Sequence, residues 1–149
     1  MFEKILIPTD LSEHSLSVCE YACDLAKKYN SEIHLLHIID DFTPILNVRT
    51  FEMTEEKIRN LQKSEAQKEV NKIKKDLEEK LGREMITEVK SGVNHIEIIK
   101  YAEENAIGLI LLASHGRTGL IHTLLGSVAE KVIRYAKCPV MVITPTKTY

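Results

Sequence analysis

Short apolar runs alternate along the chain with longer segments in which apolar residues recur at helical spacing. The short runs predict strands at residues 4–8, 32–39, 84–90, 107–113 and 139–143. The longer segments predict helices from 10–13 to 29–30, from 54 to about 81, from 93 to 105 and from 127 to about 136. Because strands and helices alternate, we expect an α/β fold with a parallel sheet and helices on both faces.

Individual residues predict where these elements end and which of them is exposed. Pro8 has no amide hydrogen, so the first strand is expected to end there. Asp10, followed three residues later by Glu13, predicts a capping box at the start of the first helix. The third strand, residues 84–90, alternates apolar and polar residues, which is typical of a more exposed position and suggests the edge of the sheet.

Two helices carry apolar stripes that predict their buried faces. Asn30 and Gly82 are suited to the left-handed conformation that ends a helix. The third helix is expected to point Ile96, Ile99 and Ala102 inward. The long second helix favours packing on the sheet; a coiled coil is the alternative, since its stripe skips a position. That stripe consists of Ile58, Leu61, Val70, Ile73, Leu77 and Leu81.

Composition limits the classes of function. A chain of 149 residues fits one compact domain spanning 1–149, and 44% hydrophobic residues are enough for a core. The net charge is −2, only 5% of residues are aromatic and there is no Trp, which argues against nucleic acid as a partner. No apolar stretch approaches the length of a membrane span, and no secretory signal precedes the first strand. We therefore expect a cytoplasmic protein with no membrane partner.

The cysteines and two of the histidines predict no redox or metal chemistry. Cys19 and Cys23 lie four residues apart on one helix face and suit buried positions. Cys138, which precedes a proline, is expected to be structural as well. His34 and His37 are three apart on a strand, so they point to opposite faces and do not share a metal. No metal ligand and no catalytic residue is assigned.

A glycine-rich segment between the fourth strand and the last helix predicts phosphate binding. Gly116 and Gly126 let the backbone approach a ligand closely. Ser127 follows as an expected helix cap with a hydroxyl, and the free amides at a helix start attract anions. The alternative is a capped helix that follows a flexible loop and binds no ligand. It is equally consistent with this local pattern, because Ser127 and Glu130 also form a capping box.

The loop after the first strand carries the complementary groups. Pro8, Thr9 and Asp10 would lie beside the glycine-rich segment if the first and fourth strands are neighbours. The Asp10 carboxylate is suited to accept hydrogen bonds from a ribose, although capping alone would also explain it. His115 and Arg117 are candidates for the terminal phosphates, with solvated loop residues as the alternative. The sequence contains neither the P-loop motif nor the dinucleotide-binding glycine motif.

These motifs together resemble the universal stress protein family over essentially the whole chain. They are Ile5-Leu6-Ile7-Pro8-Thr9-Asp10, Leu35-Leu36-His37-Ile38-Ile39-Asp40, Ser114-His115-Gly116-Arg117-Thr118-Gly119, Leu125-Gly126-Ser127-Val128-Ala129-Glu130-Lys131-Val132 and Cys138-Pro139-Val140-Met141-Val142. The resemblance implies a three-layer sandwich of the adenine nucleotide alpha hydrolase-like, Rossmann-like type. Its five-stranded parallel sheet would have the order 3-2-1-4-5.

The resemblance also implies ATP binding, with Mg²⁺ or Mn²⁺. ATP-binding members carry G-x2-G-x9-G-[ST], which falls here on Ala113, Gly116, Gly126 and Ser127, so the first position departs from the motif. A methyl group there matters little if φ is negative, and more if φ is positive or the position touches the ligand. The implied roles are ribose or adenine contact for Asp10, adenine contact for Pro8 and Ile38, sugar contact for Leu112 and Ala113, and phosphate contact for Gly116, Gly126, Ser127 and Val128.

The resemblance also implies a homodimer, commonly joined through the last strand. Val140–Ile143 suits this role because an apolar terminal strand is an unprotected edge.

Three hypotheses for the function remain open. The first is a stress-response regulator that binds ATP without turnover and acts on an unknown protein partner. The second is a slow ATPase or phosphotransferase, with Asp10, His115 and Glu130 as candidate acid–base groups. The third is a dimeric interaction module that binds no nucleotide, with residues 42–53 and the long charged helix as contact surfaces.

Overall fold

The computed structural model describes residues 2–40, 54–114 and 125–144. A five-stranded sheet at its centre has the order β3-β2-β1-β4-β5, and every adjacent pair is parallel. The strands are β1 (Lys4–Thr9), β2 (Glu32–Asp40), β3 (Ile86–Gly92), β4 (Leu109–Ala113) and β5 (Val140–Ile143). The helices are α1 (Glu13–Tyr29), α2 (Glu55–Leu81), α3 (Asn94–Glu104) and α4 (Ser127–Tyr135). The predicted α/β fold and strand order are confirmed.

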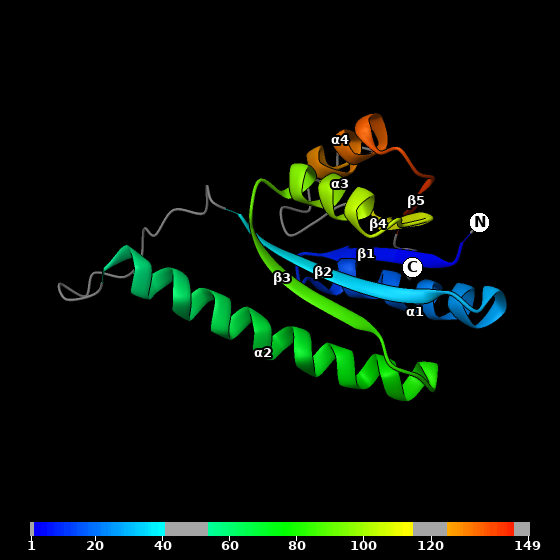
Figure 1. The fold of residues 1–149 in the computed structure, drawn as a ribbon, viewed down its shortest axis with the longest axis horizontal. Helices are drawn as coiled ribbons and strands as arrows, with labels where there is room; N and C mark the ends of the chain where they lie inside the picture. The colour runs from blue at the N-terminus through cyan, green and yellow to red at the C-terminus, as the bar shows by residue number, and fades with distance from the viewer. Residues whose placement is uncertain (1, 41–53, 115–124, 145–149) are drawn as a thin grey trace, which may run out of the picture.

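The helices form two layers on opposite faces of the sheet (Figure 1). α1 and α2 cover one face, where a core cluster contains Ile7, Leu35 and Val70. α3 and α4 cover the other face, where a second cluster contains Leu6 and Leu36. Because successive strand residues point to opposite faces, neighbours such as Leu6 and Ile7 belong to different clusters.

The long helix α2 packs on the sheet, so the preferred interpretation of its stripe is confirmed. It lies against β2, β3 and α1, and its first turns extend beyond the sheet (Figure 1). Its buried residues begin at Ala66, whereas Leu61 is 50% exposed, contrary to the predicted stripe. The residues of α2 are therefore buried only in the part of the helix that lies against the sheet.

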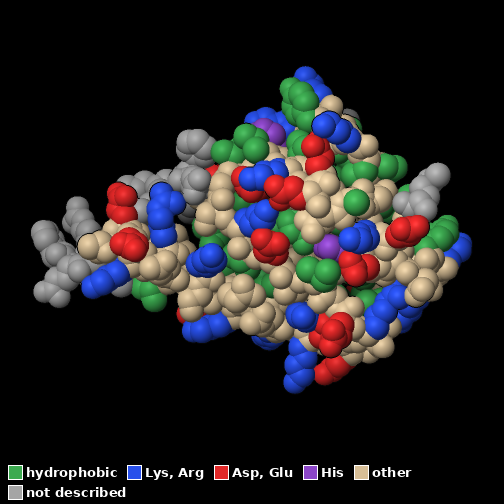
Figure 2. Space-filling view, viewed as in Figure 1, with side chains coloured by type: hydrophobic (Ala, Val, Ile, Leu, Met, Phe, Trp, Pro, Cys, Tyr) green, Lys and Arg blue, Asp and Glu red, His purple; other side chains and the backbone are tan. Residues whose placement is uncertain are grey.

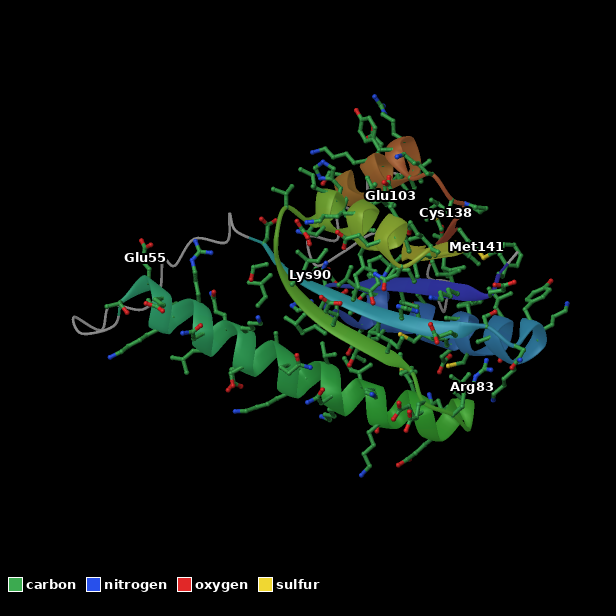
Figure 3. All side chains as sticks on the ribbon, viewed as in Figure 1. Glu55, Arg83, Lys90, Glu103, Cys138 and Met141 are labelled. Atoms are coloured by element: carbon green, nitrogen blue, oxygen red, sulfur yellow. The ribbon has the colours of Figure 1, made fainter. Side chains whose placement is uncertain are left out.

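The ends of α1 and α2 are joined by one arginine. Asn30 and Gly82 end the two helices in the left-handed conformation, with φ of 55° and 75°, as expected. Arg83 donates hydrogen bonds to Asn30 Oδ1 at 2.6 Å, to the Ala26 carbonyl at 2.8 Å and to the Ser31 carbonyl at 2.6 Å. Figure 3 shows Arg83 beside the ends of both helices. The Ala26 carbonyl also accepts the amides of Asn30 and Ser31, so the guanidinium adds side-chain hydrogen bonds to an end of α1 that the backbone already closes.

The strand boundaries differ from the prediction by one or two residues, and β4 begins at Leu109, two residues later than expected. β1 continues one residue past Pro8, which pairs in register with Leu36 of β2. On its other side β1 pairs with β4 only at Ile5 and Leu6. Pro8, which has no amide hydrogen, therefore lies beyond the hydrogen-bonded part of that pair. β3 begins and ends two residues later than expected, and it does form an edge of the sheet.

The predicted buried face of α3 is confirmed at Ala102 and wrong at Ile96. Ile96 is 51% exposed, and the buried residues are Ile98, Tyr101 and Ala102. Tyr101 is only 2% exposed because its hydroxyl has a buried partner, His34 Nδ1, at 2.9 Å. The prediction considered only aliphatic residues on this helix and therefore missed the aromatic residue Tyr101.

Leucine substitutions on α2 test how this helix packs. Leu77 is 6% exposed and Leu61 is 50% exposed, so the two carry the same side chain in opposite environments. We expect Leu77→Ala to lower the free energy of unfolding by about 2 to 4 kcal/mol. Leu61→Ala should change it by less than about 1 kcal/mol. Urea denaturation of both variants measures the two free energies of unfolding. Equal decreases would contradict the packing of α2, in which Leu77 is buried and Leu61 is not.

Thiol labelling tests the assignment of the cysteines to the core. All three are free; Cys19 and Cys23 are buried, and Cys138 is partly exposed. Burial raises the pKa of the Cys19 thiol to about 12, about four units above pH 8, so the reactive thiolate is scarce in the folded state. At pH 8 we expect a thiol reagent to modify Cys138 first, and Cys19 and Cys23 only on unfolding. Rapid modification of Cys19 in the native protein, located by peptide mapping, would contradict this.

Candidate functional site

The carboxyl ends of β1 and β4 lie side by side at the point where the strand order reverses. Register pairs Ile5 with Leu109 and Leu6 with Ile110, so both strands end at the same edge of the sheet. The chain leaves β1 toward α1 on one face, and the helix after β4 covers the other face (Figure 1). Such a switch point is where open α/β sheets bind their ligands.

The turn from β1 into α1 is fixed by its own side chains. Thr9 Oγ1 accepts a hydrogen bond from the Leu11 amide at 3.0 Å and lies 2.8 Å from Ser15 Oγ. Asp10 Oδ1 accepts hydrogen bonds from the Ser12 amide at 3.0 Å and from its hydroxyl at 2.5 Å. Leu11 has a φ of 65°, a left-handed conformation that is costly for a residue with a β-carbon. The side chains on either side of Leu11 therefore hold a strained turn.

The cap of α1 is Ser12, which corrects the prediction for Asp10. Ser12 Oγ accepts the hydrogen bond from the Ser15 amide at 3.2 Å. Asp10 lies two residues before this cap, so its carboxylate stands at the end of the strand and outside the helix. The Asp10–Glu13 spacing satisfied the capping-box rule, but Ser12 is the nearer hydroxyl and the helix begins only after it.

The departure from the family motif at Ala113 is compatible with the backbone. Ala113 is the last residue of β4 and pairs with Ile143. Among the described residues other than glycine, those with positive φ are Leu11, Asn30 and Ala106. The methyl group of Ala113 therefore introduces no backbone strain, and its effect depends on whether a ligand touches it.

Ser114 joins the two ends of the segment between β4 and α4. Its amide donates to the Ile143 carbonyl at 2.9 Å, and its carbonyl accepts from the Gly126 amide at 2.7 Å. Ser114 is 1% exposed. These bonds fix the start of α4 against the end of β4. His115, Gly116 and Arg117 belong to that segment and lie outside the described residues.

The start of α4 has no side-chain cap, which corrects the prediction for Ser127. Gly126 is the N-cap residue, with φ −73° and ψ 154°, and Ser127 is the first residue of the helix. Glu130 therefore lies one position too late for a capping box, and it pairs with Arg134 at 3.0 Å. The first amides of α4 thus point out of the helix without a side-chain acceptor from the cap.

The other helix starts in the described residues are less suited to an anion. Ser12 caps α1, and Thr54 caps α2 by accepting from the Lys57 amide. α3 has no side-chain cap, but the Glu97 side chain lies against Gly92, where a β-carbon would come within 2.8 Å of Glu97 Cγ. A carboxylate at a helix start weakens the field that attracts anions; Glu130 occupies the same position in α4, but its charge is paired with Arg134. α4 is therefore the best candidate among them.

Apolar site candidates meet beneath α3 and α4. Ile38 and Leu112 are 7% and 5% exposed in one core cluster, and Val128 packs against it. Pro8 points to the same face, because Leu6 two residues earlier belongs to that cluster. Ala113 packs instead against the cluster beneath α1 and α2. The structure thus brings together nine of the predicted residues at one edge: Pro8, Thr9, Asp10, Ile38, Leu112, Ala113, Gly126, Ser127 and Val128.

Several contacts at this edge were missed from the sequence. His37 Nδ1 lies 2.8 Å from the Thr9 carbonyl, and Asn94 Nδ2 donates to Asp40 Oδ2 at 2.9 Å. His37 and His34 do lie on opposite faces, as predicted, since His34 contacts Tyr101 of α3. The adjacency of the first two strands could have suggested the His37 contact, because it places residue 37 opposite residue 9.

The described surface shows no dominant sign of charge and no metal cluster. Lys and Arg side chains alternate with Asp and Glu over the face in Figure 2. In the parts of the chain that the structure describes, no three His, Cys, Asp or Glu side chains converge as metal ligands. The helices in those same parts are too short or too polar to span a bilayer.

Comparisons with known proteins agree on one family. The sequence model of the universal stress protein family matches residues 1–144. Universal stress protein MJ0531 of Methanocaldococcus jannaschii is 39% identical over 147 residues, which are 99% of this chain and 85% of that protein. The solved structure of MJ0577 from the same organism has a TM-score of 0.85 and 34% identity, with 99% of both chains covered. The fold is also shared by the structure of the universal stress protein from Archaeoglobus fulgidus in complex with dAMP. Its TM-score is 0.61 and its identity 21%, and the match covers 96% of this chain and 99% of that chain.

Proposed function

This chain belongs to the universal stress protein family, and we propose that it binds ATP, with Mg²⁺, as a regulatory ligand across the carboxyl ends of β1 and β4. The observation that carries the proposal is the uncapped start of α4, held beside β4 by the bond between Gly126 and Ser114. Free helix amides and a helix dipole suit phosphate oxygens. The dAMP complex of the Archaeoglobus fulgidus relative supports an adenine nucleotide as the ligand class.

Each part of the nucleotide has a candidate partner at this edge. The phosphates would lie on Gly126, Ser127 and Val128, with Gly116, His115 and Arg117 as further candidates. The ribose would lie near Thr9, Asp10 and Ala113, where a carboxylate can accept hydrogen bonds from hydroxyl groups. The adenine would lie on the apolar side chains of Pro8, Ile38 and Leu112. Mg²⁺ is commonly carried on nucleotide phosphates with several waters, so it needs few protein ligands.

The acid–base candidates favour a bound ligand over an evolved hydrolase. Asp10 accepts two hydrogen bonds from Ser12, and Glu130 pairs with Arg134. Both carboxylates thus stabilise local structure, and His115 lies outside the described residues. We propose that ATP is held and turned over slowly, well below the rate of about 1 s⁻¹ at the lower end for typical enzymes.

We further propose a homodimer that pairs through β5. β5 is an edge of the sheet, and its four residues are apolar, with Met141 39% exposed (Figure 3). The other edge, β3, carries Glu88 and Lys90, whose ammonium lies 3.9 Å from Glu88 and 3.6 Å from Glu104. Charged residues protect an edge strand from pairing, whereas β5 has none between Val140 and Ile143.

The nucleotide is tested by what the purified protein carries and binds. We expect about one adenine nucleotide per chain to be released on denaturation, or saturable binding of ATP and Mg²⁺ by calorimetry. Gly126→Val should weaken this binding at least about tenfold by blocking the close approach of phosphate. The backbone at Gly126 accepts a side chain without strain, and Val93 already occupies the equivalent cap of α3.

Circular dichroism provides the control for Gly126→Val, whose spectrum should match that of the wild type. An empty protein that also fails to bind ATP in the titration would overturn the nucleotide proposal and favour the interaction module. Rapid hydrolysis abolished by Asp10→Ala would instead favour the enzyme.

The dimer is tested by removing one outward donor from β5. Pro139 and Ile143 direct their carbonyls to β4, so the backbone groups of Val142 point to the open edge. Val142→Pro should therefore convert the dimer to a monomer while keeping the bonds to β4, and Val142→Thr should leave the dimer intact. Light scattering after size exclusion measures the mass, and a dimer in Val142→Pro would exclude β5 as the interface.

A further inference from the structure

A buried histidine reaches from β2 to the turn that carries Asp10. His37 is 8% exposed and lies opposite Thr9 in the parallel register of β1 and β2. Its Nδ1 atom is 2.8 Å from the Thr9 carbonyl oxygen. A carbonyl can only accept a hydrogen bond, so the proton of this contact must be on Nδ1. The contact therefore fixes the tautomer of His37 as well as its position.

This hydrogen bond determines the orientation of one peptide plane. The Thr9 carbonyl and the Asp10 amide belong to the same rigid unit, because the peptide bond is planar. Holding the carbonyl oxygen therefore limits the direction in which the Asp10 side chain leaves the backbone. The Thr9 hydroxyl holds the next amide, that of Leu11, and Asp10 Oδ1 is held by Ser12. His37 is the member of this network that comes from a different strand.

We propose that His37 is a positioning residue for the nucleotide: through the Thr9 carbonyl, it orients the Asp10 carboxylate toward the ribose hydroxyls. This inference rests on the proposed binding of an adenine nucleotide and adds a specific role to it. His37 itself faces the side of the sheet that α1 and α2 cover, with Leu35 and Ile39 of the same strand. Its contribution therefore passes through the backbone of Thr9.

His34 is a matched control on the same strand. It is 1% exposed, and its two nitrogens lie 2.9 Å from the Tyr101 hydroxyl and 2.7 Å from Glu32 Oε1. It lies on the opposite face and touches no residue of the β1–α1 turn in these contacts. Substituting His34 also removes hydrogen bonds of a buried imidazole, but it should not change the orientation of Asp10.

The first experiment compares Kd for ATP and Mg²⁺ by calorimetry in variants at the two positions. His37→Leu should weaken binding about tenfold, the ratio that corresponds to one lost hydrogen bond. His37→Asn, which keeps a donor at the position of Nδ1, should bind within about threefold of the wild type. His34→Leu should lose stability but keep the wild-type Kd.

A second polar variant covers the case in which His37→Leu does not fold. His37→Gln is polar as well but places its donor one bond further out, so it should bind about tenfold more weakly than His37→Asn. Equal affinities of the Asn and Gln variants, both within threefold of the wild type, would overturn the positioning role.

A double-mutant cycle tests the route through Asp10. In the Asp10→Ala background, His37→Leu should weaken binding by less than about twofold, because the group that His37 positions is already absent. A full tenfold loss in that background would show that His37 acts independently of Asp10 and would overturn the inference. A wild-type protein that binds no ATP would instead overturn the proposed function, so the two failures are distinguishable.

Discussion

The reversal of strand order between β1 and β4 is the constraint on which the rest of the structure depends. Parallel strands need crossover helices, and right-handed crossovers place a helix on the face set by the direction in which the chain moves along the sheet. Moving from β1 to β3 puts α1 and α2 on one face, and the return to β4 and β5 puts α3 and α4 on the other. The chain therefore leaves β1 and β4 in opposite directions, so the site occupies the gap between two turns at one edge.

The two turns at this edge meet their hydrogen-bonding needs in different ways. In the turn after β1, Thr9, Asp10 and Ser12 supply acceptors for the local amides. In the turn before α4, Gly126 supplies no side-chain acceptor, and the helix start is instead held in place by its bond to Ser114. One turn thus presents a carboxylate on a fixed backbone, and the other presents amides. This combination matches a ligand that has hydroxyl groups at one end and phosphates at the other.

Hydrophobic periodicity predicted the element order and sheet class because each buried strand is a short apolar run with a helix after it. It could not predict contacts that depend on which strands become neighbours. Tyr101 is a core residue of α3 because β2 brings His34 to its hydroxyl, a pairing across 67 positions of sequence. The caps failed for a local reason: Asp10 and Ser127 each satisfied a capping-box spacing, but α1 begins three positions after Asp10, with Ser12 as its cap, and α4 begins at Ser127 itself. For the candidate site, the glycine-rich pattern pointed to the edge at which the structure brings most of the predicted residues together, while the His37–Thr9 and Asn94–Asp40 contacts depend on which segments become neighbours.

Leu11 shows how local strain and the site are connected. A left-handed conformation costs a residue with a β-carbon about 1 to 2 kcal/mol, and a glycine would avoid that cost. Leu11 also packs against the core cluster beneath α1, which a glycine could not do. The chain reverses at Leu11, so α1 begins after Ser12 and the Asp10 carboxylate stays outside the helix. Hydrogen bonds from Leu11 to Thr9 and from Ser12 to Asp10 stabilise this reversal from both sides. The same interactions that offset the strain of the turn therefore also hold the carboxylate at the end of β1.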